Sequence, residues 1–170
     1  MKKWLSLFGA ISLVGTSTTS LVACSKKQEY TPEELTKLKE ENKINTTNQE
    51  IKDNLEWIAP QEKPFNKVDN KWYFIIWKGL KLDKWTLKKY KDVGLDRTNS
   101  LIDKSYSNAE LHRVSNDLHT IANKEYSSWN KDDGTYFKSI YRWNGEEQKL
   151  PDLIIDNDGN VKVRRIEKEM

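Results

Sequence analysis

Apolar side chains are densest over residues 71–77, where they alternate strictly between two faces of an extended chain: Trp72, Phe74 and Ile76 on one, and Tyr73, Ile75 and Trp77 on the other. A strand that is apolar on both faces is expected to be covered on both. After Gly79, residues 84–91 alternate again, with Trp85 and Leu87 on one face. We therefore expect a hairpin whose second strand is half exposed.

A helical period governs residues 108–127. Ser107 and Glu110 have the spacing of a capping box, in which each side chain accepts a hydrogen bond from a backbone amide at the helix start. Apolar residues then recur at helical spacing: Leu111, Val114, Leu118, Ile121 and Ala122. The pattern predicts the main amphipathic helix of the protein.

Two shorter helices are expected before residue 60. Thr31, Pro32 and Glu34 are typical of a helix start, which predicts a helix over residues 32–41. This helix has only two leucines and is expected to act as a solvated spacer.

Residues 47–50 repeat the capping-box pattern, and Ile51, Leu55 and Ile58 follow at spacing i, i+4 and i+7. The spacing predicts one apolar stripe on a short helix, which Pro60 ends.

Further strands are expected toward the C-terminus. Residues 136–143 alternate, and residues 153–155 and 161–163 flank a turn at 157–160. The order of elements predicts an α+β fold: a small, mostly antiparallel sheet packed against the 108–127 helix, preceded by the N-terminal helices and a linker.

The first 25 residues differ from the rest. Lys2 and Lys3 precede an uncharged stretch of 22 residues, Trp4 to Ser25, whose apolar core ends at Val14. This is the layout of an export signal. A membrane-spanning helix needs about 20 mainly apolar residues, so an uncleaved transmembrane anchor is the weaker alternative.

The end of this stretch, Leu21-Val22-Ala23-Cys24, resembles the lipobox of bacterial lipoproteins. The resemblance implies that Cys24 receives a diacylglyceryl group and fatty acids such as palmitate, and that the chain is cut between Ala23 and Cys24. It divides the chain into a signal peptide (1–23), a lipidated linker with the spacer helix (24–46) and an α+β globular domain (47–170).

Three later phrases, residues 71–79, 139–145 and 150–153, are together with the leader similar to phrases in small surface lipoproteins of spiroplasma-type mollicutes. The resemblance implies a lipoprotein anchored in the cell membrane of a wall-less bacterium and exposed on its extracellular face. It brings no catalytic residue to this chain.

Charge and cysteine content restrict the function further. Without residues 1–23, the 147 remaining residues carry 27 basic and 26 acidic side chains, because 29 − 2 = 27. A nearly neutral chain is not expected to bind nucleic acid. Cys24 is the only cysteine, so no disulfide is expected in the folded domain.

His112 and His119 are the only histidines. Seven residues apart on the expected helix, they would lie about 10 Å apart along its axis, too far to bind one metal ion directly. We therefore expect no metal, cofactor or catalytic residue. The alternative is a small metal-dependent or hydrolytic enzyme that uses the region around both histidines.

A basic and aromatic cluster is the most localised polar feature of the chain: Lys78, Lys81, Lys84, Trp85, Lys88 and Lys89. Lysines between aromatic residues can bind anionic ligands by charge and stacking. They can also protect an exposed edge strand while the aromatic rings pack beneath. The sequence favours a non-catalytic binding module on the membrane, whose partner is an external protein or glycan.

Overall fold

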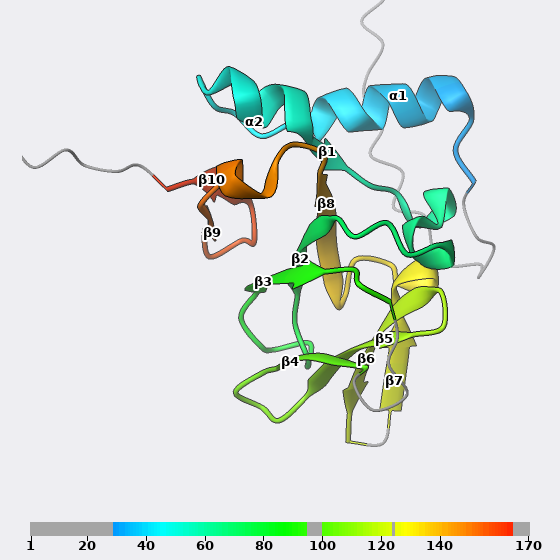
Figure 1. The fold of residues 1–170 in the computed structure, drawn as a ribbon. Helices are drawn as coiled ribbons and strands as arrows, with labels where there is room; N and C mark the ends of the chain where they lie inside the picture. Colours follow the sequence, from blue (N-terminus) through cyan, green and yellow to red (C-terminus); the bar gives the residue numbers. More distant parts are fainter. Residues whose placement is uncertain (1–28, 95–99, 124, 165–170) are drawn as a thin grey trace, which may run out of the picture.

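The computed structural model describes residues 29–94, 100–123 and 125–164. Two helices, α1 (Pro32–Glu41) and α2 (Gln49–Asn54), precede all the strands of the described chain (Figure 1). Four single turns of 3-10 helix lie between strands: η1 (Pro60–Glu62), η2 (Pro64–Asn66), η3 (Trp129–Lys131) and η4 (Glu147–Lys149).

The strands form two four-stranded antiparallel sheets and one hairpin. Sheet A has the order β1 (Leu55–Trp57), β8 (Phe137–Trp143), β2 (Trp72–Trp77) and β3 (Thr86–Lys91). Sheet B has the order β4 (Leu101–Lys104), β5 (Glu110–Val114), β6 (Asp117–Ala122) and β7 (Glu125–Ser128). The hairpin is β9 (Leu153–Ile155) with β10 (Val161–Val163). The predicted α+β fold with mostly antiparallel sheets is confirmed.

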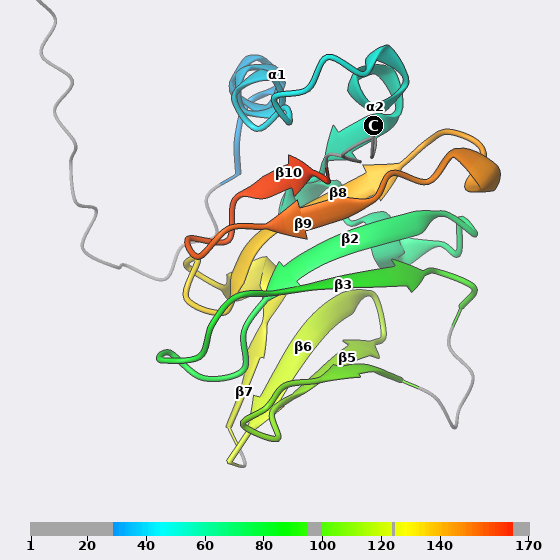
Figure 2. The same cartoon turned by 90° about the vertical axis from the view of Figure 1, so that its left-hand side faces the viewer.

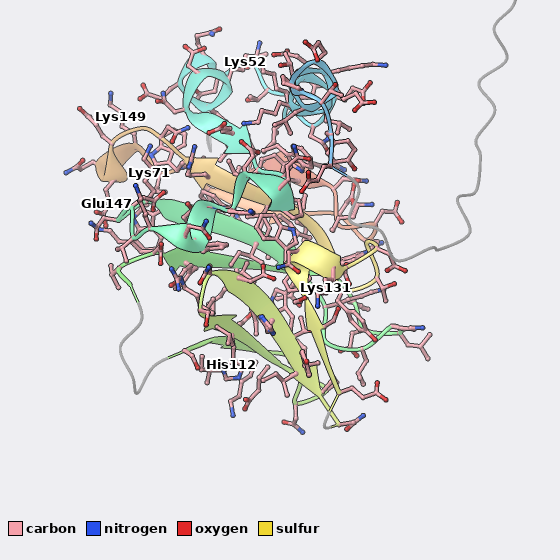
Figure 3. The ribbon with its side chains drawn as sticks, turned by 90° about the vertical axis from the view of Figure 1, so that its right-hand side faces the viewer. Lys52, Lys71, His112, Lys131, Glu147 and Lys149 are labelled. Atoms are coloured by element: carbon pink, nitrogen blue, oxygen red, sulfur yellow. The ribbon has the colours of Figure 1, made fainter. Side chains whose placement is uncertain are left out.

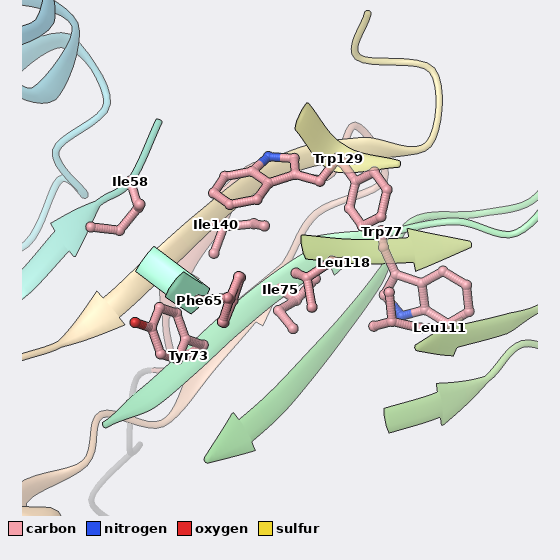
Figure 4. Close-up of a cluster of buried hydrophobic side chains, with 10 residues drawn as sticks. Ile58, Phe65, Tyr73, Ile75, Trp77, Leu111, Leu118, Trp129 and Ile140 are labelled. Carbon is pink, nitrogen blue, oxygen red and sulfur yellow. The ribbon is translucent and has the colours of Figure 1, made fainter. Parts of the chain in front are cut away.

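Sheet A is the middle layer, and β2 lies near its centre between β8 and β3. Tyr73, Ile75 and Trp77 are fully buried on the face toward sheet B, where they pack with Leu111 and Leu118 (Figure 4). The prediction that this strand is buried on both faces, and pairs with a second strand to form a hairpin, is confirmed.

The other face of sheet A is covered by α2 and the β9–β10 hairpin (Figure 2). Phe74 and Ile76 of β2 pack there with Ile51 of α2 and Leu153 of β9. The molecule thus has two cores, one on each side of sheet A. The far face of sheet B has no layer over it among the described residues.

The prediction of a helix over residues 108–127 is wrong, because this segment forms β5, β6 and most of β7. Ser107 does not cap a helix; its hydroxyl donates to Asp83 Oδ2 at 2.5 Å. Asn108 and Ser115 adopt positive φ angles of 60° and 52°, which form turns before and after β5. The sheet of the predicted fold is therefore covered by a second sheet, not by an amphipathic helix.

The stripe predicted on one short helix crosses two elements instead. Asn48, not Thr47, caps α2, through a hydrogen bond from the Ile51 amide to its side chain (3.3 Å). Helix α2 ends at Asn54, and Leu55 begins β1. Leu55 packs in the core between sheet A and α2, and Ile58 packs in the core between sheets A and B. The three apolar residues at spacing i, i+4 and i+7 therefore belong to two different cores.

Helix α1 has the predicted bounds and both hydrogen bonds of the predicted capping box between Thr31 and Glu34. None of its residues is buried, yet it is bound to the domain. Lys39 forms ion pairs with Glu56 of β1 and Glu62 of η1. Among the described residues, neither α-helix has the length and apolar content that a membrane span requires.

Candidate functional site

The β2–β3 hairpin divides the predicted basic cluster between two faces. Lys88 lies on the side of sheet B, where its Nζ is 3.1 Å from Asp103 Oδ1. Lys89, the next residue, is exposed on the opposite face of β3. Alternation along a strand makes this separation unavoidable.

The turn of the hairpin brings two members of the cluster together. Lys78 Nζ lies 4.6 Å from the centre of the Trp85 ring, a cation–π contact. Trp85 in turn packs against the backbone of Gly159 in the β9–β10 turn. Lys81 and Lys84 are exposed. The six residues therefore do not all lie on one face of the hairpin.

The structure brings His112 and His119 together, which corrects the expectation that they lie two helical turns apart. They are direct partners across the β5–β6 pair, on the outer face of sheet B. Directly opposed residues have Cβ atoms about 5 Å apart. This pairing was not predicted from the sequence, because the apolar residues of the segment also recur at helical spacing.

Each histidine nevertheless has other contacts. The Nδ1 and Nε2 atoms of His112 lie 3.1 Å from Ser100 Oγ and 2.8 Å from Glu110 Oε2. The His119 ring stacks on Tyr126, with ring centres 5.9 Å apart and planes 21° apart. Among the described residues, no group of three metal-ligating side chains is placed to hold an ion.

A pocket of about 490 Å³, which we call the η3 pocket, opens at one end of sheet B. Four segments form it: residues 60–66 with η1 and η2, the β5–β6 turn, the facing parts of β6 and β7, and η3. Trp129 of η3 forms part of the wall and is itself fixed by an edge contact with Phe65, with ring centres 6.1 Å apart. The wall is thus continuous with the core.

Backbone strain concentrates at this pocket. Five non-glycine residues in the described chain have positive φ, and three of them are asparagines, which tolerate that conformation. The other two are Lys63 (φ 48°) and Ser115 (φ 52°), and both line the η3 pocket. Strained backbone persists where the surrounding structure holds it, often at functional sites.

The pocket also has a fixed aromatic surface and a defined charge. Tyr126 is 74% exposed, but its ring is held by the stack on His119. Asp117 is buried and accepts hydrogen bonds from the backbone amides of Leu118 (2.9 Å) and Asn130 (3.2 Å). The exposed charged side chains of the pocket are Lys63 and Lys131, the last residue of η3 (Figure 3).

Two further charge clusters join separate elements of the fold. Glu56 accepts hydrogen bonds from Lys39, from Arg142 (2.8 Å) and from Asn144 (3.1 Å), which joins α1, β1 and β8. Burial opposes ionisation of Glu56, but these three donors outweigh burial and lower its pKa to about 2.

The second cluster is buried between the sheets. Asp92, which follows β3, is fully buried, and its Oδ1 lies 2.9 Å from Nε of Arg113 in β5. Arg113 also donates to the backbone oxygen of Phe65 at 2.9 Å. Burial is the first cause that raises the pKa of neighbouring Tyr90, and the negative charge of Asp92 adds to it.

Sequence reasoning did not find the η3 pocket. Its wall comes from segments up to 71 positions apart, because Pro60 and Lys131 both line it and 131 − 60 = 71.

The predicted lipidation and cleavage residues, Cys24 and Ala23, lie outside the described residues. No family model, curated protein or solved structure matches this chain.

Proposed function

We propose that this protein is a lipoprotein held on the outer face of the cell membrane by a diacylated Cys24, and that its folded domain is a non-catalytic binding module. The export-type leader and the Leu-Val-Ala-Cys sequence support the anchor. One acyl chain binds a membrane only marginally, whereas two hold a protein stably.

The η3 pocket is the observation that supports binding. It is formed by the folded domain itself, and it combines an exposed aromatic ring with amide and lysine side chains. Ligand sites in proteins are commonly such preformed hollows with a few placed polar groups. The stack of Tyr126 on His119 fixes the ring before any ligand arrives, which reduces the entropy lost on binding.

The anchor is tested by mass spectrometry and membrane fractionation of the native protein beside a Cys24→Ser variant. We expect the native chain to begin at Cys24, to carry a diacylglyceryl mass and to remain with the membrane after a high-salt wash. The variant should lack the lipid mass, because serine has no thiol to modify. A native chain that retains residues 1–23, or that carries no lipid, would refute the proposed anchor.

A further inference from the structure

The η3 pocket continues onto an exposed surface, the outer face of sheet B. Although their strands are paired within sheet B, the large apolar side chains on this face are exposed: Leu101, Val114, Ile121 and Tyr126. Ile121 and Tyr126 are direct partners across the β6–β7 pair, so their side chains lie side by side. Val114 and Tyr126 belong to both the face and the pocket.

The exposed charged side chains at the pocket are both positive and therefore favour a negatively charged ligand. Lys63 and Lys131 are exposed and form no ion pair within the described chain. Asp117, which also lines the pocket, is buried beneath its hydrogen bonds to two backbone amides. A ligand that enters the pocket therefore meets two ammonium groups at its rim.

The N-terminal end of the described chain lies beside this pocket. The Tyr30 amide donates to Gln61 Oε1 at 2.7 Å, and Gln61 Nε2 donates to the Tyr30 carbonyl oxygen at 2.9 Å. Gln61 lies between Pro60 and Lys63, which both line the pocket. The N-terminal end of the domain is therefore fixed at the pocket wall.

The connection from this point to the anchor is short. Six residue steps separate Cys24 from Tyr30, and six fully extended steps span about 20 Å. Lys26 and Lys27 lie within them, and basic residues next to a bilayer favour anionic lipids. A lipid on Cys24 would thus keep the η3 pocket close to the headgroups of its own membrane.

We infer that the η3 pocket binds the anionic headgroup of a lipid in the membrane that carries the anchor. The inference rests on the proposed lipidation of Cys24. Lys63 and Lys131 bind the headgroup phosphate, and Tyr126 with Ile121 and Val114 lies at the level of the headgroups. Tyrosine is enriched at that level because its ring is apolar and its hydroxyl is polar.

The test uses the full mature lipoprotein in lipid nanodiscs, followed by hydrogen exchange of residues 60–66 and 114–131. One set of discs contains phosphatidylcholine alone, and the other contains equal parts of phosphatidylcholine and phosphatidylglycerol. We expect slower exchange of both segments only in the anionic discs. The Lys63→Ala/Lys131→Ala variant should bind the anionic headgroup on the order of 25-fold more weakly, since each lysine near an anionic surface contributes about fivefold to affinity. The protection of both segments should fall accordingly.

The Lys84→Ala/Lys89→Ala variant is the matched control. It removes two exposed lysines of the β2–β3 hairpin, so its net charge is the same, and protection should remain. Equal loss in both variants would show that charge alone attracts the domain and would overturn the inference. So would the same protection in neutral discs on addition of free glycerol phosphate, because the pocket would then bind a soluble anion.

Failure of the anchor is distinguishable from failure of the pocket. Mass spectrometry of the same nanodisc sample reports the diacylglyceryl group on Cys24. A lipidated chain that shows no headgroup-dependent protection would refute the pocket inference and leave the anchor intact. A chain without lipid would refute the proposed anchor and, with it, the inference.

Discussion

At the scale of single residues, the least solvated charges of the described chain are Asp92 and Arg113. Asp92 is 0% exposed and Arg113 is 4% exposed, and they join the end of β3 to β5. A buried pair costs desolvation free energy, which its mutual attraction roughly offsets. The larger cost arises when one partner is removed and the other charge stays buried.

We expect Arg113→Met to lower the free energy of unfolding by about 3–5 kcal/mol, because Asp92 is then left without its cation. The Asp92→Leu/Arg113→Met double variant should recover part of the loss. Urea denaturation monitored by tryptophan fluorescence measures both. A double variant that is no more stable than the single variant would show that the loss comes from other contacts of Arg113, such as the one to Phe65.

Ionised Glu56 makes a contribution to the free energy of unfolding that is expected to be lost in acid. Its pKa is lowered from 4.5 to about 2 in the folded protein, so its contribution is fully present above pH 4.5 and is lost as the pH falls toward 2. We expect Glu56→Gln to remove about 1–2 kcal/mol at pH 7, since solvent screens this partly exposed cluster. Near pH 2 the variant and the native protein should be almost equally stable in chemical denaturation.

Other carboxyl groups, including Asp156 and Glu110, also have lowered pKa values. Both proteins therefore lose stability in acid, and the difference between them isolates Glu56. A difference that stays constant from pH 7 to pH 2 would contradict the role of its ionised form.

At the scale of elements, local signals were reliable where a single period was present. The capping box of Thr31 and Glu34 and the two-sided alternation of residues 72–77 were both predictable from sequence. Residues 108–127 carry two periods at once. Leu111 and Leu118 point into the core, while Val114 and Ile121 are exposed on the outer face, so the helical stripe does not exist in three dimensions.

The close approach of two turns gives an element-scale prediction. A Cβ on Gly79, in the turn after β2, would lie 2.1 Å from the Cβ of Ala109 before β5. We expect Gly79→Ala to reduce stability by about 1–3 kcal/mol through overpacking. Thermal unfolding of Gly79→Ala, Ala109→Gly and the double variant measures the effect.

The double variant should be more stable than Gly79→Ala alone, because Ala109→Gly removes the atom that the new methyl group meets. Ala109→Gly by itself should cost about 1–2 kcal/mol, from added backbone freedom and from the lost burial of its methyl group. If the double variant loses the sum of both single effects, the two turns do not touch in solution.

At the scale of the whole molecule, the sequence predicted the α+β class but not the arrangement of layers. Fold class follows from the number and order of elements. Five of the ten strands of the described chain, β2, β3, β8, β9 and β10, were visible in the sequence. The second sheet was hidden by the false helix, so the pairing of His112 with His119 was hidden with it. The η3 pocket depends on contacts between distant segments such as η1 and η3, which local periodicity does not encode.

The free edge of sheet A has a consequence for neighbouring molecules. Strand β3 ends the sheet, and Lys88, Lys89 and Lys91 lie along it. Lys88 and Lys91 form ion pairs with Asp103 and Glu147, and Lys89 is exposed. Proteins tethered to one bilayer move in two dimensions, where collisions between identical edges are frequent. Charged side chains along an edge strand oppose intermolecular strand pairing. Under the proposed anchoring, this row of lysines would keep a densely populated membrane from becoming a template for cross-β association.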